Sequence, residues 1–217
     1  MSLHAEQLLE LMRTRRSLRR FTHETPPKEL ISSLIEAAIT APSASNKQPW
    51  RFYVIRNAVL IKAMADAVQQ AVDRIVPRLD ATAARQFAEY GRYFVRFVDA
   101  PVVIAPAFRP LQMLSHLLDG TSDTAKDEID AAVANMETLS GVVSTSLAIQ
   151  NLLLAAHASG LGASCMSGPL LAARALEPLI GIASGWKLTC LIPLGYPDEA
   201  PAPPVRKSSG TVTRWID

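Results

Sequence analysis

The feature that most constrains this chain is a stretch of 36 consecutive residues, 138–173, without a single Asp, Glu, Lys or Arg. A membrane span needs about 20 mostly apolar residues, and residues 142–163 reach that length. Polar residues interrupt the segment too often for a lone span in hydrocarbon. A helix that is apolar nearly all round is otherwise a core helix, and in a small chain a second subunit would cover it best. We therefore expect a homodimer with this helix near the interface, and no membrane partner.

Composition predicts one domain, residues 1–217, with a sizeable core: 49% of the residues are hydrophobic and only 6% are aromatic. The dominance of Ala, Leu, Ile and Val favours helix packing over a β-sandwich. Cys165 and Cys190 provide neither a disulfide framework nor a zinc-ligand spacing, and the histidines are scattered, so we expect no metal. With no cationic and apolar leader at the start, these cysteines indicate a cytoplasmic protein.

Hydrophobic periodicity and turn residues predict an α+β fold. The expected helices are 5–13, 26–41 with Thr25 as its N-cap, 58–76, 81–97, the uncharged segment, and 169–179. The expected strands are 50–56, 101–107, 163–169 and 186–194, with a loop around 119–123. The proline-rich segment 200–217 should run over a surface. The mixed order predicts one antiparallel or mixed sheet flanked by helices.

A dense arginine cluster lies at residues 13–20, where five of eight residues carry a guanidinium. Guanidinium groups match phosphate and carboxylate oxygens with paired hydrogen bonds. A solvated basic face or a nucleic-acid patch is the alternative. Elsewhere the chain has 22 − 5 = 17 basic residues against 20 acidic ones, so the positive charge is local. This favours a compact anionic ligand and no nucleic acid.

Three other motifs carry less weight. Residues 160–162 read Gly-Leu-Gly, but a dinucleotide fingerprint needs glycine where Cys165 stands and a strand before it. A Gly-x-Ser-x-Gly elbow is absent from the sequence. No base is identified for Cys165 as a nucleophile, so a small core residue is its favoured role. No catalytic acid or base is nominated.

Four motifs in order resemble the FMN-dependent nitroreductase family. They are Arg-Arg-Ser-x-Arg at 15–19, Ala-Pro-Ser-x-x-Asn-x-Gln-Pro-Trp at 41–50, Gly-Leu-Gly at 160–162, and Leu-Gly-Tyr-Pro at 194–197 followed by Val-Arg-Lys at 205–207. The resemblance covers nearly the whole chain. It implies the nitroreductase-like α+β fold and an interlocked homodimer with FMN at the subunit interface.

The resemblance also implies roles for single residues. Arg15, Arg16 and Ser17 match the segment that holds the FMN phosphate and ribityl chain, and Arg206 and Lys207 match basic residues that return to the phosphate. Arg19 matches the cation beside the flavin pyrimidine edge, where it stabilises the reduced state. Arg20 is expected to be a surface charge.

Two loops complete the implied cofactor site. One matches the loop that reaches the flavin from the other subunit: Pro42, Ser43, Ala44, Asn46 and Gln48. The other matches the loop over the isoalloxazine, for which only the backbone role transfers: Cys165, Met166, Ser167 and Gly168. Residues 85–97 and 108–125 match no family pattern, and they lie where members select substrate.

The implied activity is reduction of electron-poor acceptors, such as nitroaromatics or quinones, with NAD(P)H as co-substrate. Hydride would pass through flavin N5 in a ping-pong cycle. Two alternatives stay open. One is related flavin chemistry on the same fold, either reductive dehalogenation or flavin fragmentation, since fold does not fix function. The other is a non-catalytic flavin-binding protein.

Overall fold

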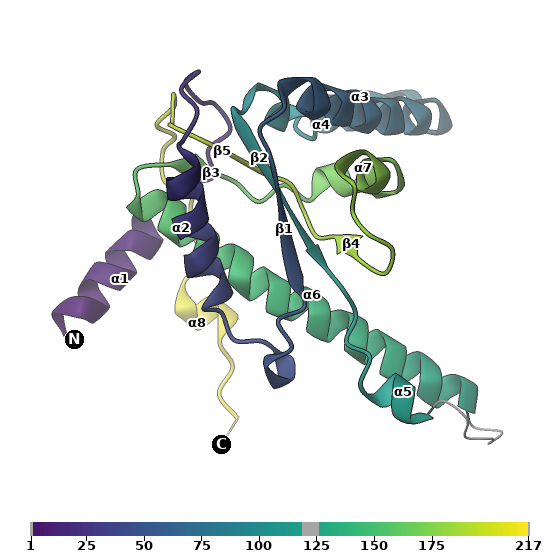
Figure 1. Ribbon diagram of the computed structural model, residues 1–217. Helices are drawn as coiled ribbons and strands as arrows, with labels where there is room; N and C mark the ends of the chain where they lie inside the picture. The colour runs from purple at the N-terminus through teal and green to yellow at the C-terminus, as the bar shows by residue number, and fades with distance from the viewer. Residues whose placement is uncertain (1, 119–125, 217) are drawn as a thin grey trace.

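The computed structural model describes residues 2–118 and 126–216, so the loop expected around 119–123 lies outside the described residues. Its centre is an antiparallel sheet with the strand order β1-β2-β5-β3, and β4 pairs with β2 beside this path. The strands are β1 Trp50–Ile55, β2 Val102–Phe108, β3 Gly162–Ala163, β4 Lys187–Leu188 and β5 Ile192–Gly195. Figure 1 shows β1 and β2 crossing the centre of the molecule with α6 running along one face.

Helices make up most of the remaining structure. The α-helices are α1 Leu3–Thr14, α2 Lys28–Ile39, α3 Ala58–Ile75, α4 Ala81–Gly91, α5 Leu114–Leu118, α6 Lys126–Ala158, α7 Ala173–Ile180 and α8 Ser209–Val212. Short 3-10 turns are η1 Ala44–Asn46, η2 Val76–Arg78, η3 Arg96–Asp99 and η4 Gly168–Ala172. The α+β prediction is confirmed.

Four predicted boundaries need correction. The N-cap of α2 is Pro27 instead of Thr25, and no side chain caps the helix. The helix predicted over 81–97 ends at Gly91, which packs against Val72, and the chain then turns to bury Phe97. The strand predicted over 186–194 is divided into β4 and β5. The strand predicted over 163–169 reduces to β3 and one isolated bridge between Met166 and Leu191.

Strand β2 divides the core into two parts, because successive side chains of a strand point to opposite faces. Val102 and Ile104 pack with α2 and α6 on one face. Val103 and Ala105 pack with α3, η3 and α7 on the other. All seven residues of β2 are buried, as expected for a strand covered on both faces.

Helix α6 begins before the uncharged segment, at Lys126, and only part of its surface is buried within the chain. It runs for 33 residues and ends at Ala158. Among the described helices it is long and apolar enough to cross a membrane by length and composition, yet a core helix passes the same test. One side, with Ala148 and Leu152, is fully buried on α2 and the sheet. The opposite side leaves Leu139 and Val143 53% and 57% exposed, so it lacks cover within the chain.

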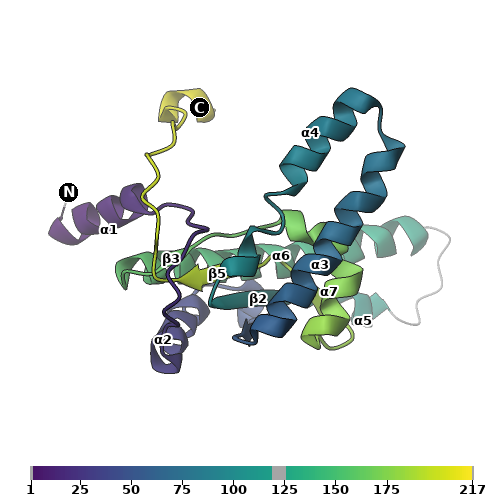
Figure 2. The same ribbon diagram turned by 90° about the horizontal axis from the view of Figure 1, so that it is seen from above.

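Two parts of the chain extend from this body. Helices α3 and α4 form a hairpin that reaches away from the sheet, and the C-terminal segment with α8 lies apart from the layers (Figure 2). Residues 201–216 are exposed throughout, and Trp215 retains 86% of its accessible surface. The expectation that this tail avoids a regular helix near its start is confirmed, since α8 begins at Ser209 and no helix is assigned to residues 200–208.

Candidate functional site

The arginine run is an ordered segment that adds to the edge of the sheet. Ser17 forms a parallel bridge with Ala163, and the Leu18 N–H donates to the Ala163 carbonyl at 3.1 Å. Glu199 accepts hydrogen bonds from the backbone N–H groups of Arg19 and Arg20. These bonds fix the direction of the backbone, so the arginines are presented at a defined place.

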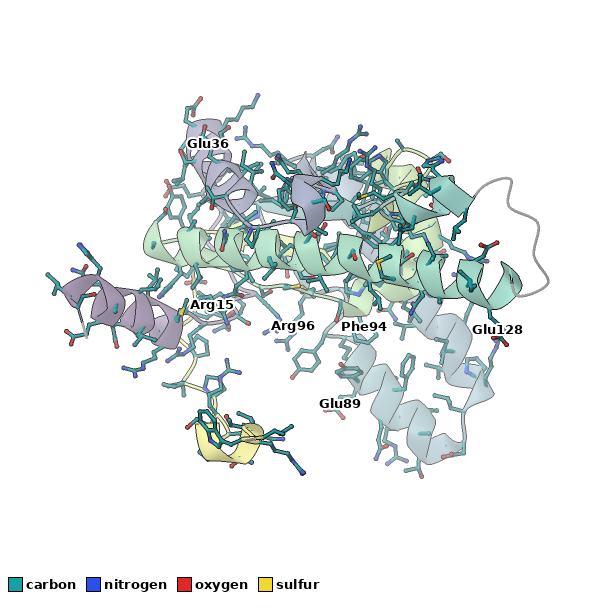
Figure 3. The ribbon with its side chains drawn as sticks, turned by 90° about the horizontal axis from the view of Figure 1, so that it is seen from below. Arg15, Glu36, Glu89, Phe94, Arg96 and Glu128 are labelled. Atoms are coloured by element: carbon teal, nitrogen blue, oxygen red, sulfur yellow. The ribbon has the colours of Figure 1, made fainter. Side chains whose placement is uncertain are left out.

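A hollow of about 300 Å³ opens beside this segment. Arg15, Arg16 and Ser17 line one side, and the tail residues Pro201, Ala202, Pro204 and Arg206 line the other. Figure 3 shows Arg15 between the end of α1 and the segment that leads to α8. We call this space the cationic hollow. The cationic hollow brings together residues from both ends of the sequence, as the family resemblance implied for Arg15 and Arg206.

The charge in the cationic hollow is uncompensated. Among the side chains that the structure describes, no carboxylate oxygen lies within 4.0 Å of Arg15, Arg16 or Arg206. Burial of Arg15, together with the charges of Arg206 and Arg16, lowers the pKa of its guanidinium. A site that gathers three guanidinium groups without an acid is suited to a multiply charged anion such as a phosphate ester.

His157 belongs to the same surroundings, although the sequence did not indicate it. Its Nε2 lies 3.0 Å from Oγ1 of Thr14, across 143 positions of sequence. Burial lowers the pKa of His157, and the charges of Arg15 and Arg16 lower it further. A histidine in the last turn of a long helix carries no sequence signal, because its partners come from tertiary packing.

The loop over residues 42–48 has a strained backbone. Ser45, Asn46 and Gln48 have φ angles of 49°, 52° and 47°, in the left-handed region that non-glycine residues seldom occupy. The Ala44 N–H donates to Oγ of Ser144 on α6 at 3.2 Å, and the Gln48 N–H donates to Oγ of Ser43 at 3.0 Å. Such strain persists where the surroundings hold it, and it is concentrated at functional sites.

An apolar groove of about 480 Å³ separates this loop from the exposed side of α6. Its walls are Pro42, Ser43 and Ala44 from the loop and seven residues of α6, from Asn135 to Leu147. Met136, Leu139, Val143 and Leu147 are all exposed and recur at helical spacing. The groove is distinct from the cationic hollow, so the two predicted parts of the cofactor site do not meet within one chain.

The loop 165–168 follows β3 into the second core. Met166 exchanges two backbone hydrogen bonds with Leu191, at 2.9 and 3.0 Å, and its side chain is buried. Cys165 is exposed, so the prediction that it is a core residue is wrong: the alternation along this extended segment points its neighbours inward instead. A hydrogen bond with the Cys190 thiol lowers the pKa of Cys165, while partial desolvation of its sulfur opposes this shift. Gly168 packs against the Phe94 ring.

Two further predicted residues lie outside these hollows. Lys207 is exposed on the tail and does not line the cationic hollow. Arg19 is half-buried beside Glu199. Arg20 is an exposed charge, and its Nε lies 3.6 Å from Glu199 Oε2. Within the described residues, no cluster of three or more His, Cys, Asp or Glu has the arrangement of a metal site.

Comparisons with known proteins agree on one family. The Nitroreductase family model matches residues 12–196. A relative from Methanothermobacter thermautotrophicus, named as an NADH dehydrogenase/NAD(P)H nitroreductase, is 29% identical over 198 residues, which are 89% of this chain and 79% of that protein. Iodotyrosine deiodinase of Drosophila melanogaster is 31% identical over 205 residues, which are 90% of this chain and 64% of that protein.

Solved structures show the same fold. A BluB-like flavoprotein from Clostridium difficile superimposes with a TM-score of 0.81 at 22% identity, covering 97% of this chain and 99% of that one. An iodotyrosine deiodinase bound to FMN and 3-iodo-L-tyrosine gives a TM-score of 0.71 at 23% identity, covering 97% and 99%. Because the sequence identities are only 22% and 23%, the structural similarity establishes the fold and nothing more.

Proposed function

The chain belongs to the nitroreductase family, and on that premise we propose that it is an FMN-dependent oxidoreductase that reduces electron-poor acceptors with NAD(P)H. The observation that carries the proposal is the cationic hollow, where Arg15, Arg16 and Arg206 converge without a compensating acid. Nitroaromatics and quinones are the proposed acceptors, and their identity depends on residues outside the matched motifs.

The chain's residues fit FMN. A phosphate monoester carries about two negative charges near neutral pH, and the cationic hollow offers three guanidinium groups and the Ser17 hydroxyl. Placing that anion there would also offset the burial of Arg15 and its repulsion from Arg206 and Arg16, which together lower the pKa of Arg15. We assign the phosphate to Arg15, Arg16, Ser17 and Arg206, and we propose Lys207 as an outer contact of the same group.

A second copy of the chain completes the site. The loop 42–48 does not line the cationic hollow. The uncovered apolar side of α6 lies beside this loop, across the apolar groove. Packing that side of α6 against a second α6 would bury Leu139 and Val143 and would bring each 42–48 loop toward the partner's flavin. We therefore propose a homodimer in which Pro42, Ser43, Ala44, Asn46 and Gln48 serve the neighbouring active site.

When bound, FMN supplies a two-electron centre that accepts hydride from NAD(P)H and passes it to an acceptor. The protein's part is orientation, charge and exclusion of water. Arg19 would place a fixed cation beside the pyrimidine edge. The backbone of residues 165–168 would cover the ring, held by the Met166–Leu191 bridge. No side chain is assigned as a general acid or base.

Reductive dehalogenation is the second candidate. It is favoured by the 31% identity to an iodotyrosine deiodinase over 90% of this chain. Both reactions would use FMN bound by the same residues, so the residues assigned above do not distinguish one reaction from the other.

Absorption spectroscopy of the purified protein tests the proposal directly. We expect flavin bands in the protein as isolated or after incubation with FMN, and NAD(P)H oxidation that depends on a quinone or a nitroaromatic. An anaerobic panel that adds halogenated tyrosine and phenol substrates separates the two candidates. Protein that stays colourless would refute the cofactor assignment, and bound FMN that never turns over would favour a binding protein.

A further inference from the structure

A second positively charged pocket is bordered by Lys47 of the 42–48 loop and shares no lining residue with the apolar groove. It measures about 200 Å³ and is bounded by Lys47, by residues 109–113 and by His116. We call it the Arg109 pocket. None of its residues belongs to the cationic hollow, and none is among the residues assigned to FMN above.

Arg109 is held in place from three directions. Its backbone N–H donates to the Pro49 carbonyl at 3.1 Å. A Cβ at Gly141 of α6 would stand only 2.5 Å from the Arg109 carbonyl oxygen, so the helix and this residue are in close contact. Its guanidinium carbon is 5.4 Å from the centroid of the Trp186 ring, which also lies 4.3 Å from the guanidinium carbon of Arg51. The backbone of Arg109 is therefore fixed by its neighbours, and its guanidinium lies near the Trp186 ring.

The charge of the Arg109 pocket is also uncompensated. In the described part of the chain, no carboxylate oxygen lies within 4.0 Å of Lys47, Arg51 or Arg109. The neighbouring acid, Glu137, is buried and accepts hydrogen bonds from the backbone N–H groups of Met113 and Leu114 and from the Ser115 hydroxyl. Its carboxylate oxygens are therefore occupied by these donors, and it forms no ion pair with Lys47 or Arg109.

We propose that Arg109 and Lys47 bind a phosphate group of the nicotinamide dinucleotide as it approaches the partner subunit's flavin. The inference rests on the proposed function, because Lys47 lies within the loop that would serve the neighbouring active site. The FMN phosphate already has its own group of arginines. Of the proposed reactants, the dinucleotide is the other one that carries phosphates, and it must bind and leave in every cycle.

The test compares two hydride donors. NADH and NADPH carry phosphates, whereas N-benzyl-1,4-dihydronicotinamide offers the same dihydropyridine without any. In FMN-loaded Arg109→Gln and Lys47→Gln variants, we expect the KM for NADH or NADPH to rise about tenfold, as for loss of a charge-assisted contact. The rate with the synthetic donor should stay unchanged. Arg78→Gln, an exposed charge in η2, is the matched control.

Equilibrium binding supplies a readout that does not need turnover. Calorimetric titration of the holoprotein with NADP+ should show the same tenfold weakening in both variants, and inorganic pyrophosphate should compete with NADP+ in the wild type. Unchanged NADP+ affinity in both variants would overturn the inference while leaving the proposed function intact. Competition by pyrophosphate that persists equally in both variants would also overturn it. Failure of the proposed function is distinguished by absent turnover with the synthetic donor.

Discussion

Gly168 lies directly against Phe94: a Cβ built on the glycine would stand 2.2 Å from Cδ1 of the ring. The contact joins the loop assigned to the flavin with the segment that follows α4, where Phe94 also meets Tyr90 edge to face at 4.9 Å between ring centroids. The absence of a side chain at 168 is thus a packing requirement, which the family resemblance alone did not explain.

Gly168→Ala should destabilise the protein by about 1–3 kcal/mol, because the added methyl must displace the Phe94 ring. Denaturant unfolding measures the loss. The double variant Gly168→Ala/Phe94→Leu should recover part of it, since the two residues are coupled. Gly210→Ala, where no heavy atom lies within 4 Å of the new Cβ, is the control and should be nearly neutral. Simple additivity of the two changes would contradict this prediction.

Arg16→Ala should weaken FMN binding about 10- to 100-fold, as expected for loss of a charge-assisted hydrogen bond of about 1.5–3 kcal/mol. Release of FMN from the variant should increase further with salt, because the remaining cations are screened. Flavin fluorescence on dilution measures retention. Arg20→Ala is the control, since Arg20 pairs with Glu199 outside the cationic hollow. Equal flavin retention in both variants would place the phosphate elsewhere.

Glu137 should make stability depend on pH. Burial alone would raise its pKa, but hydrogen bonds from the Ser115 hydroxyl and the backbone N–H groups of residues 113–115 outweigh burial and lower the pKa. The folded value therefore lies below the unfolded value of about 4.3. The resulting stability is complete above the unfolded pKa and is lost as pH falls through the folded one.

Glu137→Gln should accordingly cost about 1–3 kcal/mol near neutral pH, and the difference from wild type should shrink on acidification. Urea unfolding from about pH 6 to about pH 3 follows this change. Glu128→Gln on the same helix is the matched control, because its side chain is exposed. A difference that stays constant across this range would show that Glu137 acts through packing alone.

Val143→Lys should separate the proposed dimer, because it places a charge in the middle of the uncovered side of α6. Size-exclusion chromatography with light scattering should show monomers, and flavin retention should fall with dimerisation. Val59→Lys, which changes an even more exposed valine at the start of α3, should leave both unchanged. A Val143→Lys protein that remains dimeric would assign the interface to another face.

Local sequence patterns predicted most of the helices and strands. The positions of the site residues depend instead on tertiary contacts. Strand β2 and helix α3 follow from runs and periodic patterns of apolar residues, which act within a few residues. The approach of Arg206 to Arg15 spans nearly the whole chain, and only the family resemblance implied it. His157 carried no comparable motif, since its position depends on how α6 meets the end of α1.

The sequence also did not predict the strained backbone of the 42–48 loop. Ser45 and Gln48 adopt left-handed conformations that are ordinarily left to glycine or asparagine, and their residue types conceal this. The exposed side of α6, by contrast, was foreseen, because an uncharged helix in a small chain predicts that a second subunit covers part of it. The structure leaves Leu139 and Val143 exposed within the chain, as that prediction requires.

The conformation of the 42–48 loop has a consequence for protein engineering. Gln48→Gly would relax the backbone locally, so selection for thermostability alone would favour it. The same substitution would loosen the loop that we assign to the neighbouring flavin. A gain in thermal stability at this position should therefore be accompanied by a loss of catalytic rate. Mutant libraries designed to raise stability without losing activity should leave residues 45–48 unchanged.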